Sequence, residues 1–384
     1  MIKFTFRKLM NDLHLWLGLG SGIILFLVCF SGTLLTFEDE IKELFIEEMV
    51  VKSNGNGKKS ISNLMQNLEK EGIVNSVTIS YHEHEPYQFS VKTDPNQRRG
   101  NTYLVNPYTG VYQQKQKSSL DGFFMTMFRM HRWLLLDSKI GRPIVGVATL
   151  IFLFLSISGL YLWFPKKLKW KNFKSGFKVK FSANWKRINH DLHNTLGFYA
   201  CVYLVIMTLT GLCWSFEWYR DASSAVLGTK VFGSRGGGPK FESQLSDTIK
   251  GLSLEEIMKI SNSELNYEGT TSLSFVSTEK RVYSIAKSNA SSLSPVTSDK
   301  LILDRDGTVL NKELFSDKPL NVQIASLIKP IHTGTIFGWF SKTIYFITCL
   351  IATSLPITGT LIWWNKLQKK RKKKCNKSPL KMVS

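Results

Sequence analysis

Asp12-Leu13-His14-Leu15-Trp16-Leu17-Gly18 opens one long apolar stretch of the chain, and Asp191-Leu192-His193-Asn194-Thr195-Leu196-Gly197 opens another. The correspondence continues at a constant distance from each histidine, since Ser31-Gly32 matches Thr210-Gly211 and Glu38 matches Glu217. Self-similarity at a fixed spacing indicates an internal duplication. We therefore expect two related halves, each with a histidine at the start of an apolar helix.

Four stretches of the chain lack Asp, Glu, Lys and Arg, and each is 23 to 25 residues long. About 20 apolar residues cross the hydrocarbon core of a bilayer. The backbone there must be helical, because no water is available to satisfy its polar groups. The stretches predict four transmembrane helices, over residues 13–37, 143–165, 192–216 and 343–365.

The net charge of +21 is concentrated beside these helices. Residues 1–13, 165–190 and 366–384 carry 3, 9 and 9 Lys and Arg residues, with Asp12 as their only acid. Lys and Arg beside apolar stretches mark the cytoplasmic side of a membrane. This places both termini and the middle loop in the cytoplasm, with the chain in a bacterial inner membrane. The lipid bilayer is the expected partner, and nucleic acid is not, because no basic patch remains elsewhere.

The charge pattern divides the chain into alternating membrane and water-exposed segments. Both outer regions combine a helical periodicity with short β-like runs around a turn, Asn106-Pro107-Tyr108-Thr109-Gly110 in the first and Asp304-Arg305-Asp306-Gly307 in the second. In order, the predicted segments are transmembrane helix 1 over 13–37, an outer α+β domain over 38–130, an interfacial segment with transmembrane helix 2 over 131–165, a basic cytoplasmic loop over 166–190, transmembrane helix 3 over 191–217, a second outer α+β domain over 218–330, an interfacial segment with transmembrane helix 4 over 331–365, and a basic cytoplasmic tail over 366–384.

The second and fourth spans match each other as well, because Ser158-Gly159 corresponds to Thr358-Gly359. The whole chain is thus a tandem repeat, near residues 1–166 and 185–366. Since each half holds two spans, both halves have the same orientation in the membrane. The predicted fold is an α-helical membrane protein whose four transmembrane helices form a bundle as a tandem two-span repeat, with two extracytoplasmic α+β domains.

Five of the seven histidines lie close to the spans. His14, His190 and His193 are at the cytoplasmic ends of the first and third spans, and His131 and His332 precede the second and fourth spans on the outer side. The repeat pairs His14 with His193 and His131 with His332. Ionisable groups at membrane helices are functional candidates. The alternative is that these histidines only reach toward the lipid headgroups.

Each face of the membrane offers two imidazoles and no nearby cysteine, which is too few ligands for a zinc site. A haem supplies the other iron ligands itself, so two neutral imidazoles on facing helices suffice for its axial positions. We therefore predict two haems, one with the iron ligands His14 and His193 and one with His131 and His332. His190, three residues before His193, remains open as the inner ligand or as a neighbour of that ligand.

Basic side chains near these histidines are candidates for binding the haem propionates, and each is also explained as an anchor at the membrane interface. They are Arg129 and Arg132 beside His131, Lys329 before His332, and Arg187 two turns before His193. His131 and His332 precede their charge-free runs by 11 to 12 residues, so a straight helix would place them well outside the core. Either the helix continues at the outer surface, or the chain bends at Gly141-Arg142-Pro143 and folds the His131 segment back. Gly334 and Gly338 allow the same bend in the second half.

The chain resembles the PepSY-associated transmembrane helix family, which includes inner-membrane siderophore reductases of bacterial iron uptake. The residues that carry the resemblance are Asp-Leu-His-xxx-Leu-Gly at 12–18 and 191–197, Ser/Thr-Gly near the span ends, Pro330-Ile331-His332-Thr333-Gly334, and the PepSY-like turn that follows Val105. The resemblance implies PepSY-like outer domains, b-type haem on transmembrane histidines, and electron transfer to ferric siderophores on the periplasmic side. No nicotinamide or flavin fingerprint is present, so the expected electron donor is a quinone, a reductase or a soluble reductant.

Residues and resemblance together give one leading hypothesis, a haem-containing inner-membrane electron carrier. As an oxidoreductase it would reduce a siderophore-like ferric chelate on the outer side and release iron. Two alternatives stay open: a non-catalytic PepSY membrane protein that binds or regulates a partner such as a peptidase, and a metal transporter. A transporter is expected to carry polar groups along the middle of its spans, and the first and third spans have only hydroxyls and cysteines there.

Overall fold

The computed structural model describes residues 5–375 except for 48, 53–54, 56, 95–96, 98–99, 168, 234–240, 244, 247–250 and 276–281. Four helices in this part of the chain are long and apolar enough to cross a membrane, as predicted. They are Phe6–Leu35, Ser138–Trp163, Trp185–Ser215 and Thr335–Arg371. The chain is therefore a multi-pass membrane protein. Residues 376–384 of the predicted tail lie outside the described residues.

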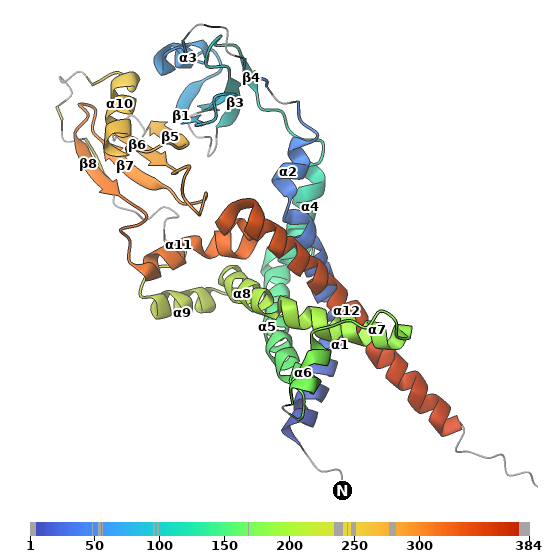
Figure 1. Cartoon of the computed structure of the whole chain (residues 1–384). Helices are drawn as coiled ribbons and strands as arrows, with labels where there is room; N and C mark the ends of the chain where they lie inside the picture. Colours follow the sequence, from blue (N-terminus) through green and yellow to red (C-terminus); the bar gives the residue numbers. More distant parts are fainter. Residues whose placement is uncertain are drawn as a thin grey trace, which may run out of the picture.

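The four spans pack as two related pairs. The first half contributes α1 (Phe6–Leu35) and α5 (Ser138–Trp163), and the second contributes α8 (Gly197–Ser215) and α12 (Gly338–Cys375). α8 continues α7 (Trp185–Asp191) through one π-helical turn, η1 (Leu192–Leu196). α1 and α8 each contact both α5 and α12 (Figure 1). The two halves therefore pack on each other along two helix pairs, with α1 and α8 on opposite sides of the bundle.

The duplication extends to the signals that start the first span of each half. Thr5 caps α1 by accepting a hydrogen bond from the Lys8 amide, and Asn184 caps α7 by accepting one from the Arg187 amide. Such side chains satisfy amides that have no partner inside the helix. The two caps lie at the same distance from His14 and His193, so each histidine enters the bundle at the same height of its helix.

Four short helices connect the spans to the outer part of the molecule. They are α2 (Glu38–Glu43) and α4 (Asp121–Trp133) in the first half, and α9 (Glu217–Leu227) and α11 (Leu320–Thr333) in the second. α6 (Trp170–Gly176) lies in the basic loop between the second and third spans. An ion pair of 2.9 Å between Lys42 and Asp121 joins α2 to α4. α4 then packs along α1, and α11 packs along α8.

A sharp turn of the backbone separates α4 and α11 from the spans that follow them. In the first half the break lies at Leu134 and Leu135, whose φ angles are 54° and 61°. The expected bend at Gly141-Arg142-Pro143 is wrong, because these residues lie inside the continuous helix α5. The second half breaks at Gly334 and Gly338 as predicted, with φ of 76° and 59° through the short helix η2 (Thr335–Phe337). Non-glycine residues rarely adopt a left-handed φ, which explains why the sequence did not indicate the first break.

On the outer side, the two predicted α+β units form one sheet. In the first half α3 (Ile61–Asn67) precedes β1 (Ile73–Ile79), β2 (Tyr87–Lys92), β3 (Asn101–Val105) and β4 (Tyr112–Gln114). In the second half α10 (Leu254–Glu264) precedes β5 (Thr271–Phe275), β6 (Tyr283–Lys287), β7 (Asp299–Leu303) and β8 (Val309–Glu313). The order is β4-β3-β2-β1-β5-β6-β7-β8, with every neighbouring pair antiparallel. β1 and β5 join the halves at the centre.

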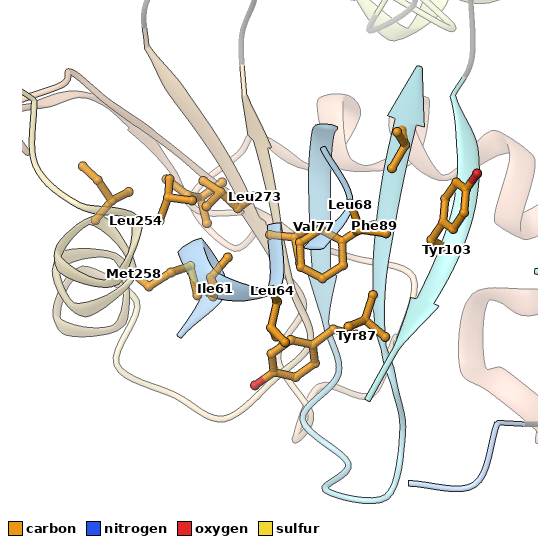
Figure 2. Packing of buried hydrophobic residues seen from close by; sticks show 14 of the residues in the cluster. Ile61, Leu64, Leu68, Val77, Tyr87, Phe89, Tyr103, Leu254, Met258 and Leu273 are labelled. Carbon is orange, nitrogen blue, oxygen red and sulfur yellow. The ribbon is translucent and has the colours of Figure 1, made fainter. Parts of the chain in front are cut away.

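The two units also share one hydrophobic core. Strand residues alternate between the core and the other face, and Phe89, Val77 and Leu273 are fully buried on the same side of the sheet. Leu64 of α3 (Figure 2) and Ile257 of α10 complete this core. Both halves contribute residues to this single core, so they are joined in the sheet as well as in the helix bundle.

A carboxylate adds a polar link between the halves. Both oxygens of Glu255 on α10 accept hydrogen bonds from Ser62 on α3, one from its amide and one from its hydroxyl, each 3.0 Å long. Burial alone would raise the pKa of Glu255, but the hydrogen bonds from Ser62 lower it below its ordinary value. The link is therefore strongest with Glu255 ionised.

We expect Glu255→Ala to lower the free energy of opening at the β1–β5 junction by about 1–3 kcal/mol, because hydrogen bonds to a charged acceptor contribute about that much. Hydrogen exchange of the β1 and β5 amides measures this change. The stabilisation should be present above the unfolded-state pKa of about 4.3 and should disappear as the pH falls through the lower folded-state pKa. Glu69→Ala removes an exposed carboxylate beside α3 and should leave exchange unchanged. Equal loss of protection in both variants would contradict the specific role of Glu255.

Candidate functional site

The inner pair of predicted histidines comes from opposite sides of the bundle. His14 lies on α1 and His193 on the π-helical turn η1. The centres of their imidazole rings are 6.4 Å apart, and the rings are nearly perpendicular. Both side chains line one cavity with about 1290 Å³ of unfilled space, part of it open to the surroundings. The structure therefore brings together two residues that are distant in the sequence.

The outer pair has the same arrangement on different helices. His131 lies in the last turn of α4 and His332 in the last turn of α11. Their ring centres are 6.3 Å apart, with an angle of 55° between the planes. The backbone turns after α4 and α11 allow these helices to lie against α1 and α8. His131 and His332 reach the bundle in this way. The ring of Trp214 lies beside His332, with the two ring centres 5.3 Å apart.

Each of the four imidazoles has the same nitrogen hydrogen-bonded to a neighbouring helix of its own half. His14 Nδ1 is 2.9 Å from the Ser158 hydroxyl, and His193 Nδ1 is 2.9 Å from the Thr358 hydroxyl. These two hydroxyls donate their own protons to carbonyl oxygens within their helices. The hydroxyl oxygens are then available to accept from the imidazoles. This arrangement favours the tautomer of both inner histidines in which Nδ1 carries the proton.

The outer histidines reach the same protonation state through backbone carbonyls. His131 Nδ1 is 2.9 Å from the Val28 carbonyl oxygen, and His332 Nδ1 is 3.1 Å from that of Met207. A carbonyl only accepts, so Nδ1 of each ring is the donor. The hydroxyl of Thr210 lies 3.1 Å from the same nitrogen of His332. In a neutral imidazole with its proton on Nδ1, Nε2 presents a lone pair, and the hydrogen bonds favour this state in all four rings.

A glycine next to each hydroxyl residue makes room for the imidazole. A Cβ atom at Gly159 or Gly359 would lie 3.3 or 3.2 Å from Cε1 of His14 or His193. The same atom at Gly32 or Gly211 would lie 3.0 Å from Cε1 of His131 or His332. These distances are shorter than ordinary van der Waals contact. Each Ser/Thr-Gly pair therefore presents a flat surface against which one imidazole packs.

The separation of the rings fits two ligands of a single metal ion. A metal–imidazole bond is about 2.0–2.1 Å long, and a ring nitrogen lies roughly 1.2 Å from the ring centre, so two imidazoles on opposite sides of one ion have centres roughly 6.4 Å apart. The inner and outer pairs, at 6.4 and 6.3 Å, both match this value. The hydrogen bonds at Nδ1 are of the kind that hold a metal-bound histidine in position.

The surroundings fit a cofactor that brings most of its own ligands. Among the described residues, no three His, Cys, Asp or Glu side chains come together as a metal site. The inner cavity is lined mainly by apolar side chains and by glycines that the repeat relates in pairs, Gly18 with Gly197 and Gly159 with Gly359. A flat macrocycle with an iron needs this combination, two imidazoles and apolar walls without projecting side chains.

The structure places the other predicted residues in different positions. His190 lines the rim of the inner cavity, and its side chain is 54% exposed, with Nδ1 3.5 Å from Asp191. Arg187 is not in the cavity lining, since its Nε donates to the buried Asp191 at 2.9 Å. Arg129 and Lys329 are exposed on their helices. Arg132 lies over the rings of Phe128 and Trp133.

Sequence reasoning missed two features of the site. Lys366 lines the inner cavity in the C-terminal part of α12. The Ser/Thr-Gly pairs were visible as matches between the halves, but their contacts with the histidines were not. A hydroxyl followed by glycine in two related spans is a weak signal by itself. The signal indicates a histidine site only when each Ser/Thr-Gly pair can be matched with one histidine of the same half.

Comparison with known proteins agrees with this organisation. No curated protein matches the chain. The family model described as the PepSY-associated TM region matches residues 12–366, a segment that includes all four spans, both histidine pairs and the outer sheet. Since the match covers nearly the whole chain, this protein belongs to the PepSY-associated TM region family.

Proposed function

We propose that this membrane protein holds two haems and carries electrons to a ferric chelate on the outer side of the membrane. The observation that supports this most is the repeated geometry of the histidines. Two facing pairs have ring centres 6.4 and 6.3 Å apart, and all four Nε2 atoms are left with a lone pair. A histidine that only reaches toward the lipid headgroups requires neither a facing imidazole nor a hydrogen bond at Nδ1. Four histidines with both features support a shared role as metal ligands.

Under this proposal the protein's own residues fix the iron ligands before any cofactor binds. His14 and His193 would hold the inner haem, and His131 and His332 the outer one. Ser158, Thr358, Thr210 and the carbonyls of Val28 and Met207 hold the proton on Nδ1 and orient the rings. Haem iron supplies one-electron oxidation and reduction when it is bound, and two histidine ligands leave no position for oxygen.

The two pairs lie near opposite surfaces of the membrane. His14 and the glycine that faces His131, Gly32, are both on α1. At about 1.5 Å per residue they are roughly 27 Å apart along the helix. The hydrocarbon core is about 30 Å thick. This separation supports transfer across the bilayer, with the inner pair on the side of the Lys- and Arg-rich segments and both termini in the cytoplasm.

A ferric chelate is the proposed acceptor because α4 and α11, the helices that carry the outer pair, lie between the spans and the folded sheet (Figure 1). One electron converts Fe(III) to Fe(II), and hard oxygen ligands bind the softer ferrous ion less strongly. The chelate would therefore release its iron after reduction. The electron donor is proposed to be a quinone, a reductase or a soluble reductant. An inner-membrane location and membership of the family are consistent with this role.

An absorption spectrum of the purified chain tests the cofactor. We expect a Soret band and sharp reduced α and β bands. His14→Ala and His131→Ala should each remove about half of the bound haem, in different redox components, because each variant lacks one ligand of one pair. His84→Ala, in an exposed outer loop, is the control and should keep the full spectrum. No haem after expression with ample supply would refute the proposal, and loss of both components in each variant would contradict two separate sites.

A second test uses the glycines. Gly32→Ala would place a methyl group 3.0 Å from Cε1 of His131, so the ring must move. We expect the spectrum to lose the component that His131→Ala removes and to keep the other. Gly20→Ala is the matched control on the same helix, since nothing lies within 4 Å of the added atom. A normal outer component in Gly32→Ala would show that His131 is not held as a ligand in this position.

Transport of electrons can be measured in sealed vesicles with a reductant inside and a ferric hydroxamate outside. A ferrous-specific dye outside should report Fe(II) with the wild-type chain, and the rate should fall to that of empty vesicles in both His14→Ala and His131→Ala. Both pairs are required because the electron must cross the full bilayer. A His14→Ala rate equal to wild type would contradict transfer through the inner pair. A chain that contains haem but gives no Fe(II) would contradict the proposed acceptor.

A further inference from the structure

The inner cavity carries its cationic and amide side chains at one end. Asn11 and His190 line the cavity, and each precedes a histidine of the inner pair by three residues. Lys366 also lines it and lies seven residues beyond Gly359 on α12. Most of the other lining residues are apolar or glycine. A ligand that fits this lining has an apolar body and a polar end that faces Asn11, His190 and Lys366.

Lys366 reaches this rim because the fourth span continues as a helix beyond its apolar stretch. Residues seven apart lie on the same face of a helix, so Lys366 is on the face of α12 that presents Gly359 to His193. At about 1.5 Å per residue it lies roughly 10 Å further along the axis. The stem of a lysine covers apolar surface while its ammonium group stays in water, which suits the open end of an apolar cavity.

The lysine that the repeat relates to Lys366 is placed differently. Lys166 follows Gly159 by the same seven residues, but α5 ends at Trp163 and Phe164 has left the helical conformation. Lys166 therefore lies beyond the helix, and it is not part of the cavity lining. Among the described residues, the lining takes a lysine from the second half and none from the first.

The charges around the cavity favour an anion at its polar end. The described residues that line it include no Asp or Glu. Lys366 carries a positive charge there, and the imidazole of His190 offers a further N–H donor. The carboxylate beside His190, Asp191, is outside the lining and is paired with Arg187 at 2.8 Å. An acceptor at the polar end of a bound ligand would therefore meet donors and no competing carboxylate of the lining.

We propose that Lys366 and His190 bind the carboxylates of the inner ligand, the propionates of the haem held by His14 and His193. This inference rests on the proposed function. It assigns to Lys366 the role that the sequence suggested for Arg187, which does not line the cavity. It also fixes one orientation of the macrocycle, with its propionates at the rim and its apolar edge inside the bundle. A phospholipid phosphate offers similar chemistry, and the experiments below separate the two sources.

The first experiment compares haem with haem dimethyl ester, whose propionates are uncharged. His131→Ala removes the outer site, so absorbance titration of the haem-free full-length chain in this background reports inner binding. We expect the ratio of haem affinity to ester affinity to fall about fivefold in Lys366→Met, the size of a partly solvated ion pair. Lys366→Arg should keep most of the ratio. His190→Gln should lower it less than Lys366→Met, because the new amide still donates a hydrogen bond.

Lys166→Met is the matched control, because it removes the same charge at the repeat-related position outside the cavity. It should keep the affinity ratio of the parent chain. An equal decrease in both variants would show only general electrostatic attraction and would overturn the inference. An unchanged ratio in Lys366→Met with the inner spectrum intact would overturn it as well. Weaker retention of phosphatidylglycerol by that variant would then assign the lysine to a lipid phosphate.

The second experiment tests the place of Lys366 without using its charge. Lys366→Cys and Lys166→Cys are each made in a full-length chain that carries His131→Ala and Cys375→Ser, and are labelled with a hydrophilic maleimide. Haem should slow labelling at position 366 severalfold and leave the rate at position 166 unchanged. Equal rates at position 366 with and without haem, in a chain with an intact inner spectrum, would overturn the inference. A parent chain without any haem spectrum would refute the proposed function and this inference together, whereas an intact spectrum with failed discrimination refutes only the role of Lys366.

Discussion

The hydrogen bond from each histidine Nδ1 to an adjacent helix is the constraint on which the rest of the site depends. It places His14 against the Ser158-Gly159 pair of α5 and His131 against Gly32 of α1, and the second half repeats both contacts. Each of the four contacts joins two residues of the same half. Each half therefore orients its own two imidazoles, and only packing of the halves is needed to make the rings face each other. The glycines are essential because any side chain there would occupy the space of the imidazole.

The sheet on the outer side joins the same two halves. β1 and β5 pair at its centre, with Thr78 and Ser272 hydrogen-bonded across the junction at 3.1 Å. α3 and α10 bury their apolar sides in a core to which both halves contribute. The pairing of strands in the sheet and the packing of helices in the bundle both join the two duplicated halves. A change that separated the halves in the sheet would also loosen the alignment of the outer histidines, because α4 and α11 connect the sheet to the bundle.

The two halves differ where a single side chain has no counterpart. Asp191 is buried and accepts hydrogen bonds from Arg187, whereas its counterpart Asp12 is only partly buried at the start of α1. Lys342 has a carboxylate partner in Glu40, whereas the Nε atom of its counterpart Arg142 has no partner among the residues that the structure describes. The two halves therefore share their helices and histidines but differ in how their charged side chains are paired.

The sequence by itself determined the number of spans, the duplication and the histidines that form pairs. These follow from local composition and from fixed spacing, since charge-free length and side-chain identity can be read directly from the chain. It did not determine the break at Leu134 and Leu135, because no local rule favours a left-handed leucine. Nor did it indicate that each ring packs against the glycine of a Ser/Thr-Gly pair, or which helix accepts the hydrogen bond from its Nδ1. Those facts depend on which helices lie side by side, and only the packing of the two halves decides that.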